Sequence, residues 1–114
     1  MGVFVRSPTR PTVYIVYWPT HRIIKAGYSE RSRWRSFIGC QIVDLVEFDS
    51  HADAFDMETI VDEMLARHFG KAFSSASEAV PFLAGDGGGY RECYLMDEGI
   101  DPIEFLSTAD WEGL

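Results

Sequence analysis

The sequence has no long apolar run and few cysteines, and both absences limit what the chain can be. None of its hydrophobic stretches approaches the roughly 18 residues that a membrane-spanning helix needs. The first residues lack the apolar segment of a signal peptide, so we expect a cytoplasmic location. Cys40 and Cys93 stand far apart without metal-ligand spacing. A disulfide and two reduced thiols both fit this count, and the missing export signal favours reduced thiols.

Basic residues are scarce in the second part of the chain. The net charge is −8, but residues 1–48 carry seven Arg and Lys against three acids, whereas residues 49–114 carry three against fifteen. A polyanion such as DNA is attracted to the first part and repelled by most of the second. Acidic surface also keeps small proteins soluble. The overall charge therefore argues against nucleic-acid binding, and its distribution leaves the question open.

The length and composition predict one globular core. The chain has 114 residues, of which 46 % are hydrophobic, and neither a repeat nor a linker divides it. We expect an N-terminal arm over residues 1–11, a domain over residues 12–97, and a short helix with a tail over residues 98–114. Asp101 and Pro102 have the cap and first-turn preferences of that last helix, after which Trp111 either docks the tail or stays exposed.

The clearest local pattern is a β-hairpin over residues 12–28. Val, Ile, Tyr and Trp fill the first strand, and residues 19–22 carry turn chemistry. A four-residue turn pairs Tyr14 with Gly27. Because paired residues share a face of the sheet, Tyr14 and Lys25 are expected to project from the same side as diagonal neighbours.

A short helix is expected after the hairpin, with Ser29 as its N-cap and Gly39 just beyond its end. Its packing face has apolar residues at i, i+3 and i+4 spacing, namely Trp34, Phe37 and Ile38. Its remaining surface carries three arginines, namely Arg31, Arg33 and Arg35.

A third strand over residues 42–49 and a long helix over about residues 52–69 follow. Ser50 and Asp53 form the capping-box pattern of this helix. Its apolar arc contains Met57, Ile60, Val61, Met64, Leu65, His68 and Phe69. Glu58 falls inside that arc, where a carboxylate loses hydration unless it meets a cation or N–H donors. Glu58 is therefore either an edge residue that reaches water or a metal ligand that faces the sheet.

The elements predicted after this long helix are shorter. Residues 74–83 predict a helix disturbed by Pro81, and residues 90–96 predict a further strand or a packed edge segment. The glycine-rich stretch 85–89 lacks the Lys-Ser/Thr of a phosphate-binding loop, so we give it little weight. The expected fold is α+β, with a small, mainly antiparallel three-stranded sheet flanked by helices in the order β-β-α-β-α.

This order of elements resembles the GIY-YIG endonuclease superfamily over about residues 12–96. Thr12-Val13-Tyr14 stands in place of Gly-Ile-Tyr, and Lys25-Ala26-Gly27 stands in place of Tyr-Ile-Gly. The second motif is similar to the Lys-Ile-Gly of a branch common in phage and bacterial proteins. Arg33-Trp34 resembles the arginine of the family's helix and the large apolar residue after it. Glu58 matches the metal-binding glutamate by order, and Gly89 to Tyr94 resembles the closing Gly-Glu-Trp-Phe-like segment.

The chain also departs from the family pattern. Thr12 replaces the first glycine, Lys25 replaces the second-motif tyrosine, and Ala26 replaces isoleucine. The interval between Gly27 and the arginines is shorter than in many relatives, so Arg31 or Arg35 could take the role given to Arg33.

The resemblance implies metal-assisted hydrolysis of DNA phosphodiesters. Glu58 would hold Mg²⁺ or Mn²⁺, and Tyr14 would orient or deprotonate the attacking water. Lys25 would supply a nearby cation or contact the phosphate, and Arg33 would neutralise its developing charge. Further candidates for DNA binding are Arg31, Arg35 and Tyr28. The alternative roles are a core position for Tyr14, a solvated lysine at 25 and a surface arginine at 33.

Two classes of function follow. The first is a small, phage-encoded or mobile-element nuclease that cuts DNA, and a homodimer would allow it to cut both strands. The second is a catalytically silent module of the same fold that binds DNA, or binds a protein through its acidic half. The missing second-motif tyrosine favours the silent module, whereas Tyr14, the arginines and the inward Glu58 favour the enzyme.

Overall fold

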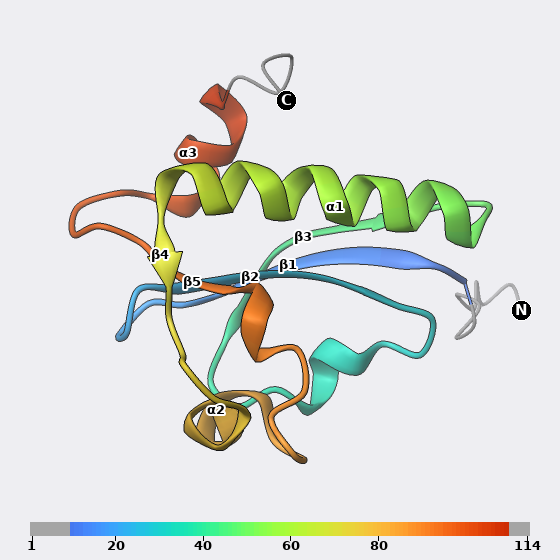
Figure 1. The fold of residues 1–114 in the computed structure, drawn as a ribbon. Coiled ribbons are helices and arrows are strands. Elements are labelled where there is room, and N and C mark those ends of the chain that lie inside the picture. The colour runs from blue at the N-terminus through green and yellow to red at the C-terminus, as the bar shows by residue number, and fades with distance from the viewer. Residues whose placement is uncertain (1–9, 110–114) are drawn as a thin grey trace, which may run out of the picture.

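The computed structural model describes residues 10–109, which are built around a five-stranded antiparallel sheet (Figure 1). The spatial order of the strands is β3-β1-β2-β5-β4. Their bounds are β1 (Thr12–Trp18), β2 (Ile23–Ser29), β3 (Gln41–Glu47), β4 (Gly70–Lys71) and β5 (Cys93–Leu95). The α+β class with an antiparallel sheet is confirmed, but the predicted count of three strands is wrong. One additional strand, β5, lies within residues 90–96, where a strand or a packed edge segment was expected, and the other, β4, has only two residues, too few to produce a readable alternation.

Helices cover both faces of this sheet (Figure 1). α1 (His51–His68) and α3 (Pro102–Thr108) lie on one face, which we call the α1 face. α2 (Ala76–Leu83) and the 3₁₀ helix η1 (Arg33–Ser36) lie on the other, which we call the η1 face. A second 3₁₀ turn, η2 (Tyr90–Glu92), leads directly into β5.

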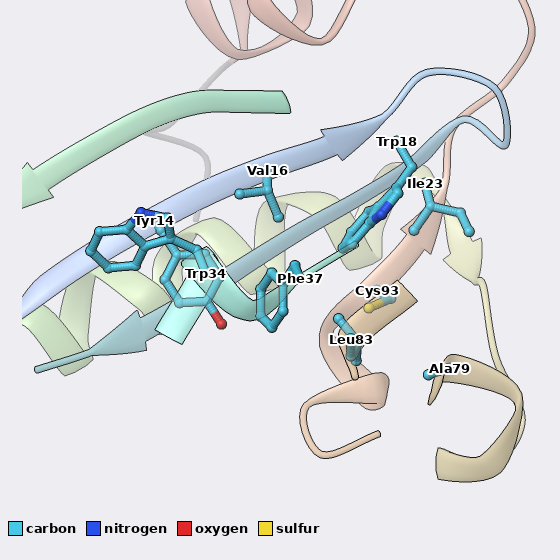
Figure 2. Packing of buried hydrophobic residues seen from close by; sticks show 9 residues of the cluster. All are labelled: Tyr14, Val16, Trp18, Ile23, Trp34, Phe37, Ala79, Leu83 and Cys93. Atoms are coloured by element: carbon cyan, nitrogen blue, oxygen red, sulfur yellow. The ribbon is translucent and has the colours of Figure 1, made fainter. Parts of the chain in front are cut away.

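The hairpin forms in the predicted register. β1 pairs with β2 so that Trp18 lies opposite Ile23 and Tyr14 lies opposite Gly27. The η1 face of β1 therefore presents Tyr14 and Trp18 to the aromatic rings that follow the hairpin, as Figure 2 shows. The ring centroid of Tyr14 is 5.5 Å from that of Trp34. This packing attaches η1 to the sheet and fixes the position of its arginines.

The α1 face has an ordinary apolar core. The Ser50 side chain accepts a hydrogen bond from the Asp53 N–H, as the capping pattern predicted, and the helix continues from there to His68. Val61 and Leu65 pack against the alternate residues of β1 and β2, including Ile24. Tyr17 is also buried in the core on this face.

The segment after the hairpin differs from the α-helix expected over residues 29–39. Ser32 adopts a left-handed conformation with φ of 58°, which interrupts any continuous helix, and only a four-residue 3₁₀ helix follows. The Ser29 hydroxyl instead accepts hydrogen bonds from the Arg31 and Arg33 N–H groups. Trp34 and Phe37 are buried as predicted, whereas Ile38 is 54 % exposed and does not belong to the packing face.

The structure also bears on the cysteines, on membrane-spanning helices and on the chain ends. Both cysteines are free, with Cys93 buried and Cys40 half-buried. Among residues 10–109, no helix has the length and apolar character needed to cross a membrane. Residues 1–9 of the predicted arm and Trp111 lie outside the described residues.

Candidate functional site

Tyr14 lies directly over Gly27, its partner across the hairpin. A Cβ atom added to Gly27 would be 2.2 Å from the Tyr14 hydroxyl oxygen, so only glycine leaves room for this ring. Tyr14 itself is 1 % exposed. Burial raises its pKa, as do the charges of Cys93, Glu58 and Glu92, while Arg33 lowers it. At neutral pH the side chain is therefore a neutral phenol.

Lys25 lies on the same face of the sheet as Tyr14, as the hairpin register predicted, and it is buried there. Lys25 is only 1 % exposed, which excludes the alternative role of an ordinary solvated lysine. Its Nζ lies 5.6 Å from the centroid of the Tyr14 ring and 3.9 Å from a Glu92 carboxylate oxygen. It also donates a hydrogen bond of 3.4 Å to the Ala26 carbonyl. Burial lowers the pKa of this ammonium group because its remaining contacts do not replace lost hydration.

Arg33 supplies the exposed cation of the cluster. Its guanidinium donates a hydrogen bond to the Gly88 carbonyl, which lies in the loop before η2. Its charge acts on both Tyr14 and Lys25. Arg31 and Arg35 are exposed on the same segment, and neither contributes to the pKa shift of Tyr14. Of the three arginines, Arg33 is thus the one that the fold brings to this cluster.

Glu58 reaches the cluster from α1, on the other face of the sheet. β5 pairs only with Ile23–Lys25 of β2, so the end of β2 lacks a strand partner on that side. There the half-buried Glu58 carboxylate lies near the backbone of Tyr28, which slightly lowers its pKa. Burial raises the pKa of Glu58 and the charge of Glu92 raises it further, whereas Lys25 opposes both effects. Glu58 is therefore a half-buried carboxylate near the charges of Lys25 and Glu92, and its role as a metal ligand stays a prediction.

The side chain of Tyr28 takes part in a different group. Because Tyr28 pairs with Val13, it projects toward the α1 face, away from Tyr14. Its hydroxyl contacts the His51 Nδ1 and lies 3.3 Å from a Glu30 oxygen. The side chain of Tyr28 therefore belongs to a group with Glu30 and His51 rather than to the cluster around Tyr14.

Sequence reasoning missed two parts of this cluster. Glu92, from η2, is the acid closest to Lys25, and Gly89 is so close that an added Cβ would lie 2.9 Å from the Lys25 Nζ. Gly89 also has a φ of +91°, which favours glycine. The signal was present as the run of glycines followed by Tyr-Arg-Glu. The glycine-rich stretch 85–89 has no phosphate-loop motif and received little weight, and the resemblance of Gly89 to Tyr94 to the family's closing segment gave Glu92 no role.

The acids of the cluster determine what it could hold. Among residues 10–109, no group of three or more His, Cys, Asp and Glu side chains is arranged to bind a metal ion. Glu58 and Glu92 are nevertheless close enough to raise the Glu58 pKa. Mg²⁺ is often bound by one or two carboxylates, with water and substrate phosphate completing its shell. The donor set therefore fits a Mg²⁺ or Mn²⁺ ion of this kind better than a closed zinc site.

Comparison with known proteins gave no match among family models, curated proteins or solved structures. A functional interpretation therefore depends on the site itself. Three consecutive elements, β1, β2 and η1, together with α1 bring a phenol, an ammonium, a guanidinium and a carboxylate into one electrostatic cluster.

Proposed function

We propose that the chain is a metal-dependent endonuclease that hydrolyses DNA phosphodiester bonds. The observation that carries this proposal is the convergence of Tyr14, Lys25, Arg33 and Glu58, in which the charges of Arg33 and Glu58 act on Tyr14 and Lys25. Phosphoryl transfer depends mostly on positioning and on charge stabilisation. This cluster offers two cations and a hydroxyl beside a carboxylate. We place the activity in the cytoplasm, with a phage-encoded origin and a homodimer as parts of the same hypothesis.

In the proposed mechanism Arg33 makes the first contact with the substrate phosphate. Its side chain is exposed, and the Gly88 carbonyl that it now contacts is a neutral acceptor that a phosphate oxygen would replace. Lys25 lies behind it and adds positive potential to the buried side of the site. Together they would stabilise the charge that develops on the phosphoryl oxygens.

Tyr14 acts in this proposal as a neutral hydroxyl. Its burial favours the protonated phenol, so orienting the attacking water by a hydrogen bond suits it better than removing a proton at neutral pH. Glu58, with Glu92 beside it, would hold Mg²⁺ or Mn²⁺. The bound ion would supply Lewis-acid polarisation of the phosphate.

The charge of the surface gives DNA one direction of approach. Arg31, Arg33 and Arg35 are all exposed on the segment that contains η1. The opposite layer contains α1, whose exposed acids include Asp56 and Glu63. DNA would therefore approach from the η1 face, where the cations reduce the overall repulsion.

The test is nicking of supercoiled plasmid in Mg²⁺, in Mn²⁺ and in EDTA. We expect metal-dependent nicking by the parent chain, and a rate lower by about 100-fold in Glu58→Ala and in Tyr14→Phe. Glu63→Ala is the matched control because Glu63 is an exposed acid on the same helix. Equal rates in the parent and Glu58→Ala would contradict the proposal.

One observation favours a second candidate, a silent module that binds DNA. Tyr14 and Lys25 are each 1 % exposed, and Gly88 and Gly89 lie against the two cations of the cluster. If this loop stays closed, phosphate reaches only Arg33 and its neighbouring arginines. The same assay separates the candidates, because the silent module would retard plasmid DNA in a gel without nicking it in either metal.

A further inference from the structure

A recess of about 280 Å³ opens beside the candidate site, between the glycine-rich loop and η2. Asp86, Gly88 and Gly89 line it on the side of the loop, and η2 contributes Tyr90, Arg91 and Glu92. Of these lining residues, the proposed function gives a direct role only to Glu92. Its lining combines an aromatic ring, a guanidinium, two carboxylates and half-buried glycine backbone.

The recess shares a wall with both cations of the site. The Gly88 carbonyl accepts the hydrogen bond from the Arg33 guanidinium, and Gly89 lies next to the Lys25 ammonium. Glu92, a lining residue, is itself 3.9 Å from the Lys25 Nζ. A group attached to a phosphate held by Arg33 is therefore within reach of the recess.

The η2 side of the recess offers flat surfaces. The Arg91 guanidinium carbon lies 5.6 Å from the centroid of the Tyr90 ring, and Arg91 Nε donates a hydrogen bond of 3.3 Å to the Tyr90 hydroxyl. Arg91 is exposed and Tyr90 is half-buried. Aromatic rings and guanidinium planes are the groups on which proteins stack unpaired nucleobases.

The two carboxylates make the recess selective. Asp86 and Glu92 repel a phosphate, so they place the sugar-phosphate backbone outside and favour a group that donates hydrogen bonds. The Asp86 Oδ1 accepts a hydrogen bond from the Gly88 N–H, and its second oxygen has no such bond among the described residues. A nucleobase with adjacent N–H donors suits such an acceptor, and guanine presents a ring N–H beside an amino group.

We propose that this recess binds one unpaired nucleobase, preferably guanine, next to the phosphate at Arg33. The substrate would then be DNA with a single-stranded segment, such as a flap, a loop or a free strand, rather than a continuous duplex. The phosphate part of this inference rests on the proposed function. The binding of the base does not require cleavage and is tested without it.

The experiment is equilibrium binding in EDTA, measured by fluorescence anisotropy with labelled 12-nucleotide thymidine strands. Three strands are compared, in which one central position is guanine, thymine or an abasic site. For the parent chain we expect the guanine strand to bind about tenfold more tightly than the abasic strand, with thymine between them. Tyr90→Leu and Arg91→Ala should each lose most of this difference, and Tyr90→Phe should keep it.

Arg67→Ala is the matched control, since Arg67 is an exposed arginine in the last turn of α1 and its loss changes the net charge equally. It should keep the preference for guanine, and circular dichroism should show that every variant is folded. Equal binding of the guanine and abasic strands by the parent, or an unchanged preference in Arg91→Ala and Tyr90→Leu, would overturn the proposal. A guanine preference without metal-dependent cleavage of plasmid DNA or of the guanine strand itself would support the recess and reject the nuclease, so the two proposals fail separately.

Discussion

Lys25 and Ala26 are neighbours on β2 and are buried almost completely, yet they face opposite sides of the sheet. Ala26 is part of the apolar α1 face, where Val61 and Leu65 also pack. Lys25 is a cation held against Tyr14, with an acid no nearer than 3.9 Å. The α1 face is thus organised for stability. The η1 face keeps a buried charge that a protein selected for stability alone would replace with an apolar residue.

The largest effect on stability is expected from the α1 face. Leu65 is completely buried there, and Leu65→Ala should lower the free energy of unfolding by about 3 kcal/mol through lost burial and a new cavity. Urea denaturation measures the loss. Plasmid nicking per folded molecule should stay unchanged because Leu65 does not contact the cluster. Loss of nicking in a fully folded variant would show that the two faces are not separable.

The second prediction concerns the contact between Tyr14 and Gly27. Gly27→Ala places a methyl group where the Tyr14 hydroxyl lies, and this overpacking should destabilise the fold by about 2 kcal/mol. The displaced ring should also lower nicking by at least about tenfold. Gly70→Ala is the matched control, since an added Cβ there meets no atom within 4 Å. If both variants behave alike in urea denaturation and nicking, the close approach has no functional importance.

Lys25→Met should act in the opposite direction and stabilise the fold by about 1 kcal/mol, because it replaces a buried charge with an apolar chain of similar length. The pKa of Lys25 is lowered in the folded state, so the unfolded chain binds more protons between that pKa and the ordinary lysine value. As the pH falls through this interval, the parent should lose stability relative to the variant. Urea denaturation across neutral and alkaline pH measures the difference. A variant less stable than the parent at every pH would contradict this prediction.

The smallest effect on stability is expected at Glu58. Its raised pKa means that the folded chain disfavours the ionised form, so stability should fall as the pH rises from the ordinary carboxyl range through the folded-state pKa. Glu58→Gln removes this dependence and should change the free energy of unfolding by no more than about 1 kcal/mol. Glu63→Gln provides the control. A much larger loss of stability would identify Glu58 as a structural residue instead.

Local patterns were sufficient for much of this fold. The hairpin register, the capped α1 and α3, and the shared face of Tyr14 and Lys25 all follow from turn length, capping residues and the two-residue period of strands. The prediction of a helix directly after the hairpin was wrong because Ser32 adopts a left-handed conformation, which no local sequence pattern indicates. Helix propensity alone does not show at which residue a helix is interrupted.

The remaining features depend on contacts between distant segments. Lysine is usually exposed, and its burial at position 25 follows from the return of the chain through Gly89 and Glu92. That return requires β5 to lie between β2 and β4, although β5 has only three residues. The recess beside η2 exists for the same reason. A pattern in the sequence identifies residue types, but here the pairing of a very short strand decides which of them meet.

The most direct test of the nuclease proposal is the rate of plasmid nicking by Lys25→Met in Mg²⁺. The rate is measured at a temperature where the unfolding curve of this variant shows that it is fully folded. We predict that the parent nicks plasmid in Mg²⁺ and not in EDTA, and that Lys25→Met is at least as stable and about 100-fold slower. A folded Lys25→Met that nicks as fast as the parent would contradict the account, because the buried cation would then serve neither stability nor catalysis.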